Sequence, residues 1–340
     1  MVVITCTNWR PSEHTVLLLL PLRYGESPDS RHVPPAVLAP PPHQPRHHRP
    51  CRLNGRPVCV WMLRRLTARS LRLPFRLFST SSEAQKLDAF QALLERGLGV
   101  SDQVHDMREP MASKLRTRGW FACDGLLGET HIATLRREVE GLHAAGHFSQ
   151  SYSEVAETGE RIWRENVEAM ELKPDTWESA PTLVAYLAEM MRAVPANLNA
   201  FNDQLALSTT NFGHKLAVST GAGAHYPKHL DNTIGAPHDM RKLTAILYLN
   251  PSWDDTNGGE IRIFDGADDS QPPTELLPHG DRLLLFWSDL LVHQVMPCYE
   301  QAAHGHRFTF TMWFASDNPL AIANRSDPLY ALRERHYPSL

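Results

Sequence analysis

The chain of 340 residues is long enough for one large domain or two ordinary ones, and its formal net charge of −4 at pH 7 gives no reason to expect a nucleic-acid partner. The five cysteines are odd in number and scattered, so they form neither a disulfide framework nor a zinc-finger spacing, and we expect a reducing compartment. No apolar run approaches the length of a transmembrane helix, so no membrane partner is expected.

Residues 1–82 differ in composition from the rest of the chain. Prolines cluster at 34–50, and no acidic residue occurs between Asp29 and Glu83. Such a segment buries too little apolar surface to fold alone, so we interpret it as a disordered leader. From Met62 onward, arginines alternate with leucines before a Ser/Thr-rich end, a composition typical of a mitochondrial transit peptide or of an arginine-rich linker. We expect a mitochondrial protein if translation starts at Met62, and otherwise a cytoplasmic or nuclear one.

Residues 83–204 have helical periodicity, and we expect them to form a helical support region. Apolar residues recur at helical spacing in three stretches, which we interpret as core contacts. They are Leu87, Phe90 and Leu94 in the first stretch, Ile132, Leu135, Val139 and Leu142 in the second, and Leu183, Leu187 and Met191 in the third. Gly97 is expected to end the first helix. The third is predicted to begin at an N-cap Ser179, to hold Pro181 in its first turn and to stop before Pro195.

After about residue 204 the pattern becomes that of β-strands. Short apolar segments rich in β-forming residues, separated by turns such as DDTNGG and SQPPTE, predict strands at 241–250, 259–265, 281–289 and 306–315. Several short strands broken by Gly and Pro favour a double-sheet jelly roll, which we place at 205–318. The fold class is therefore α+β, a double-stranded β-helix (jelly roll) core supported by N-terminal helices. Residues 319–340 form a C-terminal tail, in which the last stretch looks helical.

The stretch HYPKHLDN places His229 and Asp231 two residues apart. In an extended segment, residues i and i+2 point to the same side, so one metal ion could be held by both. Two ligands make a weak site, and His293, just after the strand at 281–289, supplies a third. Two histidines and one carboxylate form the facial triad of non-haem Fe(II) oxygenases, which leaves coordination positions open. An H-x-D pair alone occurs by chance, but its order relative to the strands and the second histidine makes the signal specific.

A cation follows on the next predicted strand. Strand alternation places four of its residues on one face, namely Arg307, Thr309, Thr311 and Trp313. An arginine on the inner face of a β-roll is costly unless it is paired, and the carboxylate of a dicarboxylate cosubstrate would pair it bidentately. The alternative is an arginine at a sheet edge that bridges to an acidic side chain. The upstream His293 favours the cosubstrate.

Residues 215–315 resemble the 2-oxoglutarate- and Fe(II)-dependent dioxygenases, and within them the prolyl 4-hydroxylase group, especially its oxygen-sensing (HIF-type) branch. The resemblance rests on HYPKHLDN, RKLTAILYLNPSWDDTNGGEIRIF, DRLLLFWSD and RFTFTMW, in which R-x-x-x-T-x-W is similar to that branch. The segment 119–148 also looks like the helical support region of the family, so the resemblance spans roughly 119–315.

The resemblance implies that His229, Asp231 and His293 bind Fe(II), with no catalytic side chain beyond these metal ligands. It further implies 2-oxoglutarate as cosubstrate, O2 as oxidant and L-ascorbate as the reductant that keeps the iron ferrous. Oxidative decarboxylation of 2-oxoglutarate would release succinate and CO2 while the substrate is hydroxylated. The expected substrate is a prolyl residue in a protein or peptide.

The resemblance also implies roles around the metal. Arg307 would bind the distal carboxylate of 2-oxoglutarate, assisted by Tyr248 and Thr311. Trp313 would pack beneath the site, and Tyr226 would border the substrate entrance.

Two features depart from the HIF-type branch. Ser219, ten residues before His229, stands where those enzymes have a tyrosine that helps to bind 2-oxoglutarate. The stretch PCYEQAAHG at 297–305 is longer than in that branch. These departures imply a differently organised cosubstrate end and altered access to the site.

Other readings remain open. A small-molecule hydroxylase of the same superfamily fits the same motifs, and so does a non-catalytic β-roll that binds metal or peptide. A nucleic-acid demethylase usually shows a second arginine six residues after the first, where Trp313 stands. A halogenase has a small residue in place of the carboxylate ligand, and Asp231 argues against it.

Overall fold

A computed structural model describes residues 4–5, 81–155, 160–221, 223–266, 270–299 and 306–337. The expectations for the leader 1–82, including a transit peptide from Met62, therefore fall almost wholly outside the described residues. None of the helices in the described ranges is both long and apolar enough to cross a membrane.

The three predicted helical stretches are helices, and further helical segments accompany them. The α-helices of the described residues are α1 (Ser81–Arg96), α2 (Val100–Asp106), α3 (Arg108–Arg118), α4 (Glu129–Ala144), α5 (Pro181–Asn199) and α6 (Tyr330–His336). The short 3-10 helices are η1 (Pro174–Ser179), η2 (Asp203–Leu205), η3 (Asp255–Asn257) and η4 (Pro319–Ala321). The predicted apolar stripe of α4 is buried in the core.

Helix α5 does not stop before Pro195, as the sequence predicted, but runs on to Asn199. A proline inside a helix removes one backbone hydrogen bond. Here the helix continues because Val194 and Leu198 on either side are buried in the core. The helix end is also fixed, since the Asn199 side chain hydrogen-bonds both backbone groups of Leu207, at 2.8 and 2.9 Å.

The N-cap of α5 is Ala180, not the predicted Ser179, which instead ends η1. The reason is a tertiary contact. Glu138 of α4 accepts hydrogen bonds from the free N–H groups of Thr182 and Leu183, at 3.0 and 2.9 Å. A carboxylate at this position satisfies the first turn and complements the helix dipole, so no local capping side chain is needed.

The strands form two antiparallel sheets. The major sheet has the order β1-β3-β4-β5-β12-β7-β10-β2, and the minor sheet has the order β6-β11-β8-β9. The strands of the major sheet are β1 (Ile4–Thr5), β2 (Trp120–Asp124), β3 (Ser149–Val155), β4 (Arg161–Met170), β5 (Leu207–Ser219), β7 (Arg241–Tyr248), β10 (Arg282–Trp287) and β12 (Arg307–Ser316). Those of the minor sheet are β6 (Tyr226–His229), β8 (Ile261–Ile263), β9 (Thr274–Leu276) and β11 (His293–Val295).

Each of the four predicted strands is present, as β7, β8, β10 and β12. The segment 83–204, expected to supply helices, also supplies β2, β3 and β4, which join the major sheet. Strands β3 and β4 have no clean alternation of apolar and polar residues, because much of β4 is exposed on both faces. The period-two signal was therefore missing from this hairpin.

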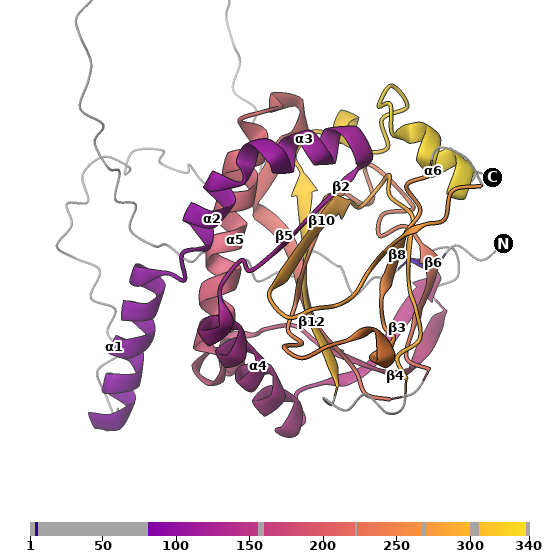
Figure 1. Cartoon of the computed structure of the whole chain (residues 1–340). Coiled ribbons are helices and arrows are strands. Elements are labelled where there is room, and N and C mark those ends of the chain that lie inside the picture. Colours follow the sequence, from indigo (N-terminus) through magenta and orange to yellow (C-terminus); the bar gives the residue numbers. More distant parts are fainter. Residues whose placement is uncertain are drawn as a thin grey trace, which may run out of the picture. The chain divides into compact units, whose positions relative to one another are not determined.

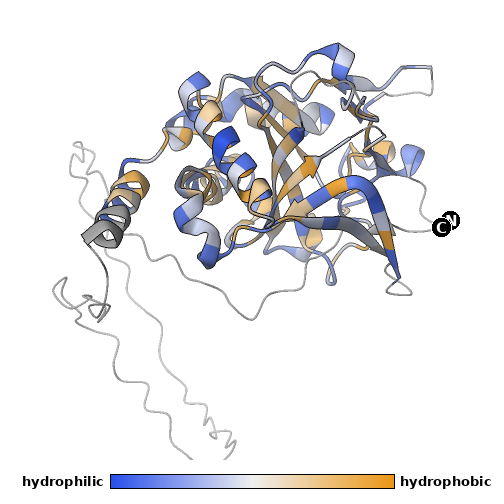
Figure 2. Ribbon diagram, turned by 90° about the horizontal axis from the view of Figure 1, so that it is seen from below, coloured by the Kyte–Doolittle hydropathy of each residue, from blue (hydrophilic) through white to orange (hydrophobic). Residues whose placement is uncertain are grey.

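Helices and the minor sheet cover opposite faces of the major sheet (Figure 1). Helices α2 to α5 lie on one side, and β6 and β8 lie on the other. Strand alternation sorts the side chains between these layers. On β12, Phe308, Phe310, Met312 and Phe314 join the large core beneath the helices, while the residues between them face the minor sheet. In Figure 2, hydrophobic segments lie along the central strands, and several outer helices are mostly hydrophilic. The arrangement confirms the expected α+β jelly roll.

Candidate active site

The three predicted metal ligands converge at one end of the minor sheet. His229 ends β6 and pairs in register with His293, which begins β11. The Nε2 atoms of His229 and His293 lie 3.5 and 3.8 Å from Oδ1 of Asp231. All three residues are buried, and within the described residues they form a cluster whose donor atoms lie within 4.8 Å of one another. Donor atoms about 2 Å from a shared ion and at right angles lie about 3 Å apart, so this spacing fits one metal ion.

Each histidine presents the same nitrogen to the centre. Nδ1 of His229 lies 2.7 Å from the carbonyl oxygen of Pro227, and Nδ1 of His293 lies 3.2 Å from that of Leu291. A proton on each Nδ1 can donate to these carbonyls, so the nitrogen that each ring turns toward Asp231, and can offer to a metal ion, is Nε2. Burial, together with the nearby His229, lowers the pKa of His293 to about 4. At neutral pH His293 is therefore an uncharged imidazole that can bind a metal ion.

The two carboxylate oxygens of Asp231 have different neighbours. Its Oδ2 accepts hydrogen bonds from Thr244 Oγ1 at 2.6 Å and from Trp313 Nε1 at 3.0 Å. Oδ1 is left to face the two histidines. Burial would raise the pKa of this carboxyl, but the side chains of His229 and His293 outweigh it and hold the pKa well below its usual range. Asp231 is therefore an anion in the folded protein.

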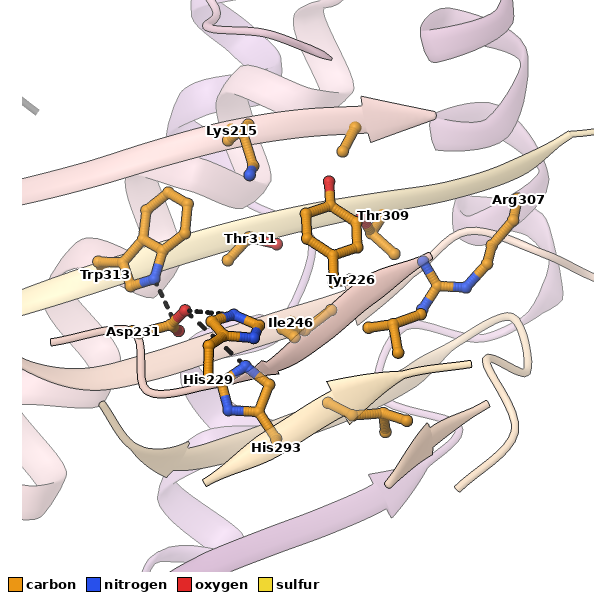
Figure 3. A pocket seen from close by; sticks show the side chains of 13 residues that line it. Lys215, Tyr226, His229, Asp231, Ile246, His293, Arg307, Thr309, Thr311 and Trp313 are labelled. Carbon is orange, nitrogen blue, oxygen red and sulfur yellow. Dashed lines mark hydrogen bonds and ion pairs between the residues drawn. The ribbon is translucent and has the colours of Figure 1, made fainter. Parts of the chain in front are cut away.

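A pocket of about 500 Å³, including the space at its mouth, opens onto this cluster (Figure 3). All four residues that alternation placed on the inner face of β12 line it, as predicted: Arg307, Thr309, Thr311 and Trp313. Its apolar walls are Ala217, Ile246, Ile261 and Val295, and the remaining lining side chains are Lys215 and Tyr226. Such a mixture of apolar walls and a few convergent polar groups is typical of a small-ligand site.

Arg307 lies at the end of this pocket away from Trp313 (Figure 3). Its Nε donates to the carbonyl oxygen of Gly259 at 3.0 Å, and its guanidinium lies 5.4 Å from the ring centre of Tyr248. No carboxylate of the described residues forms an ion pair with it. The hydroxyl of Tyr248 is buried and, within the described residues, has no hydrogen-bond partner. Buried polar groups are rarely left unpaired, so a guanidinium without a carboxylate partner and a phenol without a hydrogen bond fit an anionic ligand at this end of the pocket.

Two glycines before β8 make room for this arginine. Gly258 and Gly259 have φ values of +65° and +72°, the left-handed region that favours glycine. A Cβ on Gly259 would lie 3.0 Å from Cδ of Arg307 and 2.8 Å from Sγ of Cys298. The NGG sequence is therefore required by the packing of Arg307 as well as by the turn.

The other predicted residues take definite positions. Tyr226 lines the pocket, and its ring stacks on that of His229 at 6.4 Å. Tyr248 does not line the pocket itself, but is the register partner of Thr309. Ser219 is buried and pairs in register with Arg307, so the departure from the HIF-type pattern lies at the arginine end. Of the longer stretch 297–305, residues 300–305 lie outside the described residues.

Sequence reasoning missed Lys215 and Thr244. Thr244 lies two residues before Ile246 on β7, so alternation along that strand would have placed it on the pocket face. Lys215 lies on β5, a strand that was not predicted individually, and it could not be placed without the register of β5 with β12.

Comparison with known proteins agrees with this geometry. Residues 214–315 match the family model described as "2OG-Fe(II) oxygenase superfamily". The "Hypoxia-inducible factor prolyl hydroxylase" of Caenorhabditis elegans is 27% identical over 263 residues, which cover 73% of this chain and 35% of the relative. "Egl nine homolog 1" of Homo sapiens is 28% identical over 204 residues, or 59% of this chain and 44% of the relative. The chain thus spans less than half the length of these two relatives.

Solved structures share the fold. A prolyl hydroxylase from Trichoplax adhaerens aligns with a TM-score of 0.54 and 21% identity, covering 72% of this chain and 96% of that one. A structure titled for prolyl 4-hydroxylases from Phytophthora capsici aligns with a TM-score of 0.54 and 25% identity, covering 70% and 76%. The core is therefore the double-stranded β-helix of these enzymes, and residues 214–315 form a 2OG-Fe(II) oxygenase domain.

Proposed function

We propose that this chain, which carries a 2OG-Fe(II) oxygenase domain at 214–315, hydroxylates a prolyl residue in a protein or peptide. In the balanced reaction, 2-oxoglutarate, O2 and substrate C–H give succinate, CO2 and substrate C–OH. One observation carries the proposal: the metal-ligand cluster of His229, Asp231 and His293 lines the same pocket as the guanidinium of Arg307. The names of the relatives as prolyl hydroxylases support the choice of a prolyl substrate.

The side chains around the pocket would divide the work. His229, Asp231 and His293 would hold Fe(II), which when bound supplies the activation of O2. Arg307 would bind the distal carboxylate of 2-oxoglutarate in a charge-assisted pair. The buried hydroxyl of Tyr248, which has no hydrogen-bond partner within the described residues, would add a donor at the same end. The hydroxyl of Thr311 would add one further along β12, toward the metal cluster.

The remaining lining controls access. Ile246, Ile261 and Val295 would exclude water from the cosubstrate, which strengthens its pairing with Arg307. Tyr226 would border the side from which the substrate enters. L-ascorbate would keep the iron ferrous between turnovers.

The test is succinate formation by the purified full chain supplied with Fe(II), 2-oxoglutarate, ascorbate and air, without added substrate. We expect slow succinate release that is abolished in Asp231→Ala, because loss of the carboxylate removes a ligand. Adding a mixture of proline-containing peptides should accelerate release and yield peptides heavier by one oxygen atom. Absence of both iron binding and 2-oxoglutarate binding in the wild-type protein would refute the enzyme and support a non-catalytic β-roll.

A further inference from the structure

Lys215 is a second cation in the pocket, at the metal end, away from Arg307. In the register between β5 and β12, Lys215 faces Thr311, while Arg307 faces Ser219. The two positions are four residues apart along the strands, about 13 Å. A 2-oxoglutarate molecule with one carboxylate on Arg307 would extend toward the metal cluster. Lys215 therefore lies on the side of the metal where the substrate must present its reacting carbon.

Two aromatic rings hold the Lys215 side chain in the pocket (Figure 3). Its Nζ lies 5.3 Å from the ring centre of Trp313 and 5.5 Å from that of Tyr226. These contacts orient the ammonium through cation–π attraction, but they do not replace hydrogen bonds to its three N–H donors. Lys215 is half-buried, and its side chain lines the pocket.

No carboxylate of the described residues pairs with Lys215. Burial raises the pKa of Glu171, and the charges of Lys173 and Lys215 partly offset that rise. Glu171 is therefore near both lysines, but it forms no ion pair with either of them. A further cation stands nearby, because the guanidinium of Arg164 lies 4.3 Å from the ring centre of Tyr226. Among the residues that line the pocket, the one carboxylate is Asp231, which is committed to the metal cluster, so Lys215 has no carboxylate partner within the pocket.

We infer that Lys215 determines specificity by binding a carboxylate that the substrate carries next to the carbon to be hydroxylated. The inference rests on the proposed function and deepens it, since it names the substrate class: acidic substrates. The carboxylate could belong to an Asp or Glu beside the target prolyl residue, or to the carboxyl end of a proline itself. Both sources offer the same anion to an ammonium with free donors in a partly desolvated site, where such pairing discriminates strongly.

The test compares isosteric pairs that differ only in charge. One pair is a peptide with a single proline preceded by Asp and the same peptide with Asn. The other pair is N-acetylproline and its amide. The measured quantity is the ratio of hydroxylation of acid to amide, because any loss of iron or 2-oxoglutarate binding in a variant cancels in that ratio. The proteins are wild type, Lys215→Met, Lys215→Arg, Lys215→Glu and, as a control, Lys173→Met, whose exposed lysine does not line the pocket.

We expect at least one pair to show a preference for the acid of about tenfold in the wild type and in Lys173→Met. The ratio of acid to amide should fall to near unity in Lys215→Met and should persist in Lys215→Arg. In Lys215→Glu the charge preference should reverse, so that a peptide carrying Lys in place of Asp is preferred. The pair that responds identifies the source of the carboxylate. An unchanged ratio in Lys215→Met, or no preference in the wild type, would overturn the inference. A rise in KM for 2-oxoglutarate with an unchanged ratio would do the same, because Lys215 would then serve the cosubstrate.

Binding of the same pairs, measured by titration calorimetry under nitrogen with Fe(II) and 2-oxoglutarate present, separates the two proposals. A Lys215-dependent preference in binding without any hydroxylation would support the acidic ligand and count against prolyl hydroxylation. Hydroxylation with no charge preference would support the enzyme and overturn the role of Lys215. No Lys215-dependent preference with either pair also overturns it.

Discussion

The indole Nε1 of Trp313 donates a hydrogen bond to Oδ2 of Asp231 at 3.0 Å, across 82 residues of sequence. Trp313 belongs to the major sheet, and Asp231 lies two residues beyond the end of β6 in the minor sheet, so this bond ties the two layers at the metal cluster. Together with Thr244, it occupies one carboxylate oxygen and turns the other toward the histidines. Trp313 therefore does more than pack beneath the site, because it sets which oxygen can bind a metal ion.

Replacing Trp313 with Phe should weaken Fe(II) binding by about tenfold, since partners that orient a ligand typically contribute that much to metal affinity. Phe keeps an aromatic side chain but removes the N–H donor together with the five-membered ring of the indole. Metal titration of the chelator-treated protein measures the effect. Trp163→Phe, which alters an exposed indole on β4, serves as the control. Equal metal affinity in Trp313→Phe and wild type would show that Thr244 alone fixes the carboxylate.

Gly259→Ala should raise the KM for 2-oxoglutarate by about tenfold or more. The new Cβ would press on Cδ of Arg307 and displace its guanidinium, whose Nε donates a hydrogen bond to the Gly259 carbonyl. Gly146→Ala is the matched control, because Gly146 has a similar φ of +77° but nothing within 4 Å of its would-be Cβ. If both variants lose stability equally and neither changes the KM, the glycine is needed only by the turn.

Much of this site could be predicted from local sequence, because the patterns that indicate it span only a few neighbouring residues. The inner face of β12 follows from alternation alone, and His229-x-Asp231 needs only an extended backbone. Trp313 was placed correctly by position, but its bond to Asp231 depends on how two sheets meet. No pattern within β12 contains that information.

The errors have the same origin. Pro195 stays inside α5 because Leu198 and Asn199 have partners elsewhere in the fold, and Ala180 caps that helix because Glu138 reaches it from α4. Lys215 was overlooked because its place in the pocket follows only from the pairing of β5 with β12, in which it lies opposite Thr311. Local propensity sets the expectation, and tertiary contacts decide these cases.

Arg333→Met should destabilise the protein by about 2 kcal/mol, as expected for loss of a buried charged hydrogen-bond donor, and should also weaken metal binding. Arg333 of α6 donates to the carbonyl of Asp289 at 2.6 Å and lies 3.4 Å from the carbonyl of Asn232. These residues belong to the segments that carry His293 and Asp231, so one side chain fastens both.

Arg335→Met, at an exposed position of the same helix, controls for loss of charge. Thermal melting followed by circular dichroism gives the stability, and metal titration gives the affinity. A destabilised Arg333→Met that binds metal normally would limit α6 to a role in stability.

Acid should destabilise the chelator-treated wild-type protein more than His214→Gln. Burial lowers the pKa of His214 to about 4, against an ordinary value of 6.5, although the Leu172 carbonyl partly offsets this effect. Its Nε2 accepts a hydrogen bond from the Leu172 N–H at 3.1 Å, a role that requires a neutral ring. Because the folded state binds this proton more weakly than the unfolded state, the stabilising contribution is complete above pH 6.5 and is lost as pH falls toward 4.

Between pH 7 and 4.5 the wild type should therefore lose about 2 kcal/mol more than the variant, which has no titrating group at this position. Urea unfolding of both proteins at the two pH values measures the difference, in which the titration of all other groups cancels. Parallel losses in the two proteins would mean that His214 is protonated as easily in the folded state as in the unfolded one.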